Sequence, residues 1–157
     1  MKKNEEYIVT CIDDTDLNSG VVKIDDMVVF VPNLLIGEKA KIKIVKVNKK
    51  YAFGIITQLL EPSINRQELT CEVAKTCGGC QLQHMSYAYQ LDYKYKHVKK
   101  LFEDIEVKPI LGMDNPWYYR NKAQFPVKIK DGKVQMGFYR QHSNDVVTCK
   151  ECKIQDH

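Results

Sequence analysis

The sequence has 157 residues, 44% of them apolar and 28% charged, which is ordinary for a globular protein with one domain or two small ones. No apolar run approaches the length of a membrane span, and no apolar stretch follows the N-terminal lysines as it would in a signal peptide, so we expect a cytoplasmic protein away from membranes. The net charge of +4 comes entirely from residues 63–157, where 15 Lys and Arg face 11 Asp and Glu. This excess suits a polyanionic partner, but solvated surface lysines would explain it equally well.

The first 60 residues contain short β-rich runs separated by turn residues. Five such runs in close succession predict a small barrel of the OB type. A Glu-Pro-Ser linker at 61–63 then marks a boundary between a barrel at 1–62 and a second region at 63–157. The predicted strands are 7–12, 20–24, 27–31, 39–47 and 51–60.

The fourth of these runs alternates lysines with apolar residues, which places the lysines on one face and the apolar side chains in the core. The alternation changes phase at Val45, which predicts a β-bulge near Ile44–Val45. The lysine stripe either follows an RNA backbone or keeps an edge strand soluble. Its members are Lys39, Lys41 and Lys43.

Several segments of this first region resemble a TRAM domain. The resemblance implies an accessory RNA-binding barrel attached to an RNA-modifying enzyme. It is carried by residues 29–32, 36–40, 42–47 and 49–52.

Six cysteines in a chain with no export signal point to thiols rather than disulfides. Three of them, Cys71, Cys77 and Cys80, lie within ten residues, and Gly78 and Gly79 separate the last two. The glycines allow positive φ angles, and we expect the turn to direct backbone N–H groups at the sulfurs. This cluster predicts a metal site.

The fourth ligand must come from Cys149 or Cys152, and two sets are possible. Two C-x-x-C knuckles, at Cys77/Cys80 and Cys149/Cys152, would bind zinc, although their separation is long for a zinc ribbon and Cys71 would be unused. Alternatively, Cys71, Cys77, Cys80 and one distal cysteine would hold an iron–sulfur cubane, which the spacing favours.

The cysteine motif and three later segments resemble the RNA (uracil-5-)-methyltransferase family, in its 23S ribosomal RNA branch. The resemblance implies a 4Fe-4S cluster on Cys71, Cys77, Cys80 and Cys152, with Cys149 as a bystander. Asn144 departs from the family, which usually has a histidine there, and His142 is a possible substitute. The segments that carry the resemblance are 71–84, 112–127, 137–140 and 152–155.

Between the cysteine groups, the apolar spacing predicts one long helix over 86–103 with Ser86 as N-cap. The family resemblance implies that this helix packs on a methyltransferase domain. Residues 117–148 read as strands with a turn at Asp131-Gly132, so we expect a mainly β chain with an α+β second region. Basic and aromatic residues are interleaved here, either as a half-buried sheet or as a surface for single-stranded RNA. With the lysine stripe, the candidate RNA contacts are Arg120, Asn121, Lys122, Gln124 and Arg140, and the candidate stacking rings are Trp117, Tyr119 and Tyr139.

No segment resembles a G-x-G-x-x-G cofactor loop, and we assign no catalytic residue. The resemblance implies that the complete enzyme uses S-adenosylmethionine to make 5-methyluridine, and that the cofactor site and the attacking cysteine lie in a domain beyond these residues. We therefore expect these 157 residues to be an inactive, monomeric RNA-recognition part, with 23S rRNA as the partner. The alternatives are a transfer RNA methyltransferase, or a stand-alone iron–sulfur or zinc protein that binds RNA without catalysis.

Overall fold

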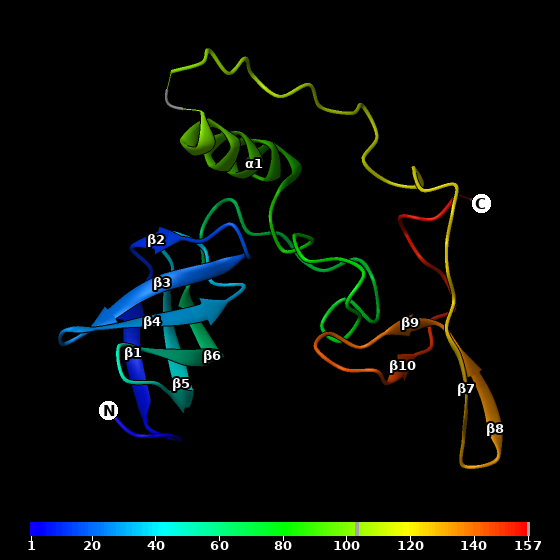
Figure 1. Cartoon of the computed structure of the whole chain (residues 1–157), viewed down its shortest axis with the longest axis horizontal. Coiled ribbons are helices and arrows are strands. Elements are labelled where there is room, and N and C mark those ends of the chain that lie inside the picture. The colour runs from blue at the N-terminus through cyan, green and yellow to red at the C-terminus, as the bar shows by residue number, and fades with distance from the viewer. Residues whose placement is uncertain (103, 157) are drawn as a thin grey trace. The chain divides into compact units, whose positions relative to one another are not determined.

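The structure is a computed structural model that describes residues 1–102 and 104–156, and the chain divides into two compact units, residues 1–66 and 67–157 (Figure 1). The regular secondary structure of the described residues is mainly β-strand with one helix, as the sequence predicted. Within the described residues, no helix is both long enough and apolar enough to span a membrane.

The first unit is a curled six-stranded sheet in the order β1-β5-β6-β4-β3-β2, consistent with an OB-like fold. Neighbouring strands are antiparallel except β4 and β6, which are parallel. The five predicted strands are confirmed, and Asp13–Asp14, between the first two of them, forms a short sixth strand because it pairs with Gly20 and Val21 of β3. The strands are β1 (Glu6–Thr10), β2 (Asp13–Asp14), β3 (Ser19–Ile24), β4 (Met27–Pro32), β5 (Lys39–Val47) and β6 (Tyr51–Glu61).

The core of this unit follows the predicted alternation along β5. Ala40, Ile42 and Ile44 are fully buried, whereas the lysines between them are only partly covered. The predicted bulge is confirmed, because the pairing with β6 shifts register between Ile44 and Lys46. The edge-strand explanation of the lysines is wrong, since β5 lies between β1 and β6. Cys11 is a buried core residue, and burial raises the pKa of its thiol to about 11.

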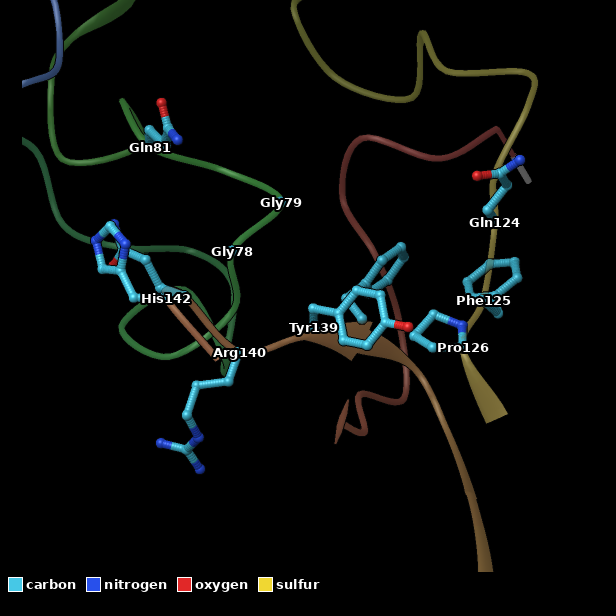
Figure 2. A pocket seen from close by; sticks show the side chains of 11 residues that line it. Gly78, Gly79, Gln81, Gln124, Phe125, Pro126, Tyr139, Arg140 and His142 are labelled. Carbon is cyan, nitrogen blue, oxygen red and sulfur yellow. The ribbon is translucent and has the colours of Figure 1, made fainter. Parts of the chain in front are cut away.

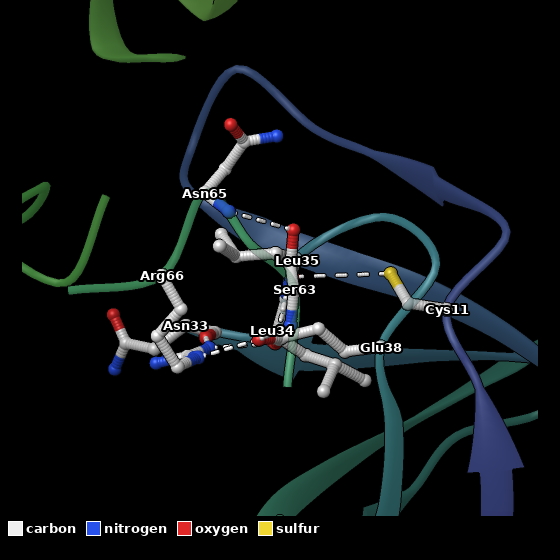
Figure 3. Close-up of polar contacts among 8 residues, drawn as sticks. All are labelled: Cys11, Asn33, Leu34, Leu35, Glu38, Ser63, Asn65 and Arg66. Carbon is white, nitrogen blue, oxygen red and sulfur yellow. Dashed lines mark hydrogen bonds and ion pairs between the residues drawn. The ribbon is translucent and has the colours of Figure 1, made fainter. Parts of the chain in front are cut away.

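A buried carboxylate, Glu38, fastens the end of this unit to the barrel (Figure 3). It accepts hydrogen bonds from the backbone N–H groups of Leu35 (2.9 Å) and Ser63 (3.0 Å) and from Arg66 Nε (2.5 Å) and Nη2 (2.7 Å). Burial alone would raise the pKa of Glu38, but these donors outweigh it and hold the pKa below its ordinary value of 4.5. The chain after β6 is therefore tied back onto the turn that precedes β5.

The second unit contains the helix α1 (Tyr87–Leu101). Its predicted N-cap is confirmed, because the Ser86 side chain accepts a hydrogen bond from the Tyr89 N–H. The helix is shorter than predicted, since Phe102 already leaves the helical conformation, and Glu103 lies outside the described residues. Tyr93 is the buried residue of the helix and packs against the His97 ring, whereas the apolar side chains of the last turn are exposed.

The remaining strands of the second unit are β7 (Val127–Lys130), β8 (Lys133–Met136), β9 (Phe138–Tyr139) and β10 (Val146–Val147). Asp131 and Gly132 form the predicted turn between β7 and β8, and both have positive φ angles, as a type I′ hairpin turn requires. The prediction that strands begin at residue 117 is wrong. Residues 117–126 instead form only an isolated bridge from Arg120 to Gln155, because their backbone pairs with the chain end rather than within a sheet.

Candidate functional site

Five of the six cysteines line one small cavity in the second unit. All five thiols are free and partly buried. The walls between them are largely apolar and include Val73, Ala74, Phe138 and Ile154. The fold has thus brought together two groups of thiols that are about 70 residues apart in the sequence. The five are Cys71, Cys77, Cys80, Cys149 and Cys152.

Two tight turns and one strand position the first three thiols. The N–H groups of Ala74 and Cys77 bond to the carbonyls of Cys71 (3.1 Å) and Val73 (2.8 Å), which curls residues 71–77 around the cavity. The following loop is then fixed to the β9 segment, because the N–H of Gly78 donates to the carbonyl of Tyr139 (2.8 Å) and Cys77 bridges to Arg140.

The distal thiols are held by contacts on both sides of them. The backbone N–H of Lys150 donates to Glu72 Oε1 (3.1 Å), which ties this segment to the loop that carries Cys71. Further along, the N–H groups of Tyr118 and Arg120 donate to the carbonyls of Lys153 (2.9 Å) and Ile154 (2.8 Å). These long-range bonds fix Cys149 and Cys152 against the cavity.

The two glycines of the Cys-Gly-Gly-Cys turn do not use the positive φ angles that glycine allows. Gly78 instead favours close approach, since a Cβ there would make a tight contact 3.1 Å from the Tyr139 carbonyl oxygen. One part of the expectation holds, because the Gly79 N–H donates to Cys77 Sγ at 3.3 Å.

The electrostatics of the cavity disfavour several unliganded thiolates at once. Burial raises the pKa of Cys80. The charges of nearby thiolates raise the same pKa further, and Cys152 contributes most among them. Burial and the same neighbours also raise the pKa of Cys149. A cationic centre bound among these sulfurs would reverse that repulsion, because coordination favours the deprotonated thiol.

The donor set fits a soft-metal or iron–sulfur group in kind, since thiolates are the ligands that such centres take. Within residues 1–102 and 104–156, however, no group of three or more His, Cys, Asp or Glu is arranged to hold a metal ion. The thiols line one cavity without forming a coordination geometry in this structure.

The other predicted site residues fall into two sets. The lysine stripe lies in the first unit, where Lys39 pairs with Glu61 (3.1 Å) and Lys41 with Glu6 (2.6 Å). Lys43 forms no ion pair with another described residue. The remaining predicted contacts lie in the second unit, with Arg120 half-buried beside the cysteine cavity and the others exposed: Asn121, Lys122, Gln124 and Arg140.

Sequence reasoning missed an aromatic cluster on the first unit. Phe30, Tyr51 and Phe53 pack with ring centroids 5.5–5.9 Å apart on β4 and β6. Their neighbours Val29 and Ala52 are fully buried, so the alternation places these rings on the outer face of the sheet. The only sequence signal was alternation within each strand, which could not show that the two strands are adjacent.

Comparison with known protein families matches residues 3–57 to the TRAM domain. The match covers the curled sheet described above from β1 into β6. Residues 3–57 form a TRAM domain. The sequence resemblance of the first region is thereby confirmed, and the lysine stripe and the aromatic cluster both belong to the TRAM domain.

The whole chain, TRAM domain and cysteine region together, is similar to proteins named uncharacterized RNA methyltransferases. It is 45% identical over 99% of its length to one from Halalkalibacterium halodurans and 42% identical over 99% to one from Clostridium tetani. A Listeria monocytogenes protein of the same description is 43% identical over 98%. The chain spans 35% of the length of each of these relatives.

A solved structure shares the fold beyond the TRAM domain. The tRNA (uracil-54, C5)-methyltransferase of Pyrococcus abyssi, solved in complex with S-adenosyl-L-homocysteine, aligns with 95% of this chain and 33% of its own. The TM-score is 0.57 and the sequence identity 23%, which establishes a common fold.

Proposed function

We propose that this chain is the RNA-recognition part of an S-adenosylmethionine-dependent RNA (uracil-5-)-methyltransferase that makes 5-methyluridine in 23S rRNA. The observation that carries the proposal is the similarity of almost the entire chain to proteins named RNA methyltransferases, with a TRAM domain at its start. The role of this chain is to bind and orient RNA, since it offers cations and exposed rings on both units.

We further propose that the cysteine cavity holds a 4Fe-4S cluster through Cys71, Cys77, Cys80 and Cys152. The gathering of these thiols within apolar walls supports this assignment. Such a cluster would cross-link three loops of the second unit, and we assign it this structural role. Cys149 lines the same cavity and is the thiol left over.

A transfer RNA substrate is the second candidate, because the similar Pyrococcus structure is described as a tRNA methyltransferase. The two candidates predict different losses. RNA isolated from a strain that lacks the gene should lose a 5-methyluridine from 23S rRNA, measured by mass spectrometry of RNase fragments, and keep it in tRNA. Loss from tRNA alone would favour the second candidate. Loss from neither would favour a stand-alone RNA-binding protein.

Residues 1–157 alone should bind no S-adenosylmethionine and show no methyl transfer. The physical reason is that the sequence offers no glycine-rich loop to receive the cofactor. Isothermal titration of the purified chain with S-adenosylmethionine measures this directly, and a saturable heat would contradict it.

The lysine stripe of the TRAM domain should contribute to the salt dependence of RNA binding. Each phosphate contact to a single strand contributes about 0.7 to the log–log slope, so replacing Lys39, Lys41 and Lys43 with alanine should flatten the slope by roughly two units if all three touch phosphates. Exposed ion pairs such as Lys39–Glu61 are weak, about 0–1 kcal/mol, so RNA can compete with them.

The matched control for the stripe is Lys23→Ala, which removes an exposed lysine from β3. Lys43→Ala alone should flatten the slope by about 0.7, whereas Lys23→Ala should leave it unchanged. Unchanged affinity and slope in the folded triple variant would show that the stripe only solubilises the barrel.

A further inference from the structure

A second, larger hollow is lined by Gly78 and Gly79 of the Cys-Gly-Gly-Cys turn (Figure 2). Its volume is about 610 Å³, within the range of about 300–1,000 Å³ that is usual for small-ligand sites. Gly78 and Gly79 form one wall, and Phe125 and Pro126 form another, with the Tyr139 ring between them.

Two rings of this hollow are open to solvent. Phe125 is 46% exposed and Tyr139 is 50% exposed. The Phe125 ring packs against the Phe138 ring, with ring centroids 5.1 Å apart. Tyr139 is held by its backbone, since its carbonyl accepts the Gly78 N–H. The structure thus supports two rings without covering their faces.

A basic depression of about 440 Å³, lined by Arg120 and Lys122, adjoins the hollow. Gln124 and Phe138 line both spaces. Arg140 lies on the hollow and extends away from the rings. Within residues 1–102 and 104–156, no acidic side chain pairs with Arg120, Lys122 or Arg140. These cations are therefore available to an external anion.

Uncovered rings beside unpaired cations match the chemistry of one unstacked nucleotide, whose base stacks on a ring and whose phosphates need positive charge. Gln81, Gln124 and Gln141 add amide groups that can hydrogen-bond a base edge. We propose that this hollow binds one unstacked nucleobase of a single-stranded RNA, with neighbouring phosphates at Arg120 and Lys122 and at Arg140. The inference rests on the proposed RNA-binding function and assigns it a specific site.

The test uses residues 1–157 and a short, fluorescently labelled single-stranded RNA, with a series in which one position at a time is abasic. Fluorescence anisotropy should find one position whose missing base weakens binding about 5- to 150-fold. Tyr139→Ala should weaken binding of the intact RNA by a similar factor and remove the abasic penalty, because base and ring act as a pair. Tyr139→Phe, which keeps the ring, should preserve the affinity.

Two control variants separate this site from general effects. Ile129→Ala removes an exposed apolar side chain from β7 of the same unit and should change nothing. Arg140→Ala should flatten the salt slope by about 0.7. If RNA binds in a salt-dependent way but Tyr139→Ala leaves the affinity and any abasic penalty intact, the nucleobase site is overturned. The proposed RNA-binding function would then still stand. Absence of any RNA binding at low salt would overturn both.

Discussion

Protein prepared without oxygen is expected to be brown and to contain one 4Fe-4S cluster, and Cys152→Ser is expected to abolish it. Removing one of four thiolates leaves an iron without its protein ligand. The same loss should follow Cys71→Ser, because Cys71 belongs to the proposed ligand set and lines the cavity with Cys152. Visible absorption together with iron and sulfide analysis measures the outcome.

The matched control is Cys149→Ser, which removes a thiol from the same cavity that is not needed by the proposed ligand set. This variant should keep its colour and its iron. The zinc alternative uses Cys149 and not Cys71, and so predicts the opposite pair of results. One tightly bound zinc without iron, lost in Cys149→Ser and retained in Cys71→Ser, would establish the two-knuckle site.

Replacing Glu38 with glutamine is expected to destabilise the first unit by about 3 kcal/mol, at the lower end of the 3–5 kcal/mol typical for breaking a buried ion pair. The lower end applies because the Arg66 side chain is 20% exposed and can partly recover water. A drop in Tm of about 12–24 °C should accompany the change. Thermal unfolding followed by circular dichroism measures it.

Glu61→Gln is the matched control, since it breaks a surface pair in which Lys39 and Glu61 are 43% and 69% exposed. Its effect should stay below about 1 kcal/mol. Equal losses in the two variants would show that Arg66 contributes nothing beyond a surface pair.

The Glu38 network also makes the stability of the first unit depend on pH. The folded protein holds the pKa of Glu38 below its ordinary value of 4.5, so the native state binds fewer protons than the unfolded state. The stabilisation is therefore complete above the ordinary glutamate pKa and is lost as the pH falls through the lowered pKa of the folded state. In Glu38→Gln this part of the acid destabilisation should disappear.

Local patterns in the sequence determined much of the first unit. The alternation along residues 39–44 placed Ala40, Ile42 and Ile44 in the core and predicted the bulge beside Val45, because strand periodicity is read from neighbouring residues. Ser86 marked the start of the helix for the same reason, since capping is local. The cysteine spacing likewise identified a thiol cluster as the feature that carries chemistry.

Only the tertiary structure decided which distant residues meet. The sequence did not indicate that Glu38 would be buried against Arg66, that Phe30 would lie beside Tyr51, or that Gly78 would approach Tyr139 closely. It also misread residues 117–126 as strands, because their backbone pairs with the chain end instead of a neighbouring strand. The physical reason is the same in each case. Propensity and periodicity act over a few residues, whereas burial, ion pairing and the shape of a hollow depend on which segments the folded chain brings into contact.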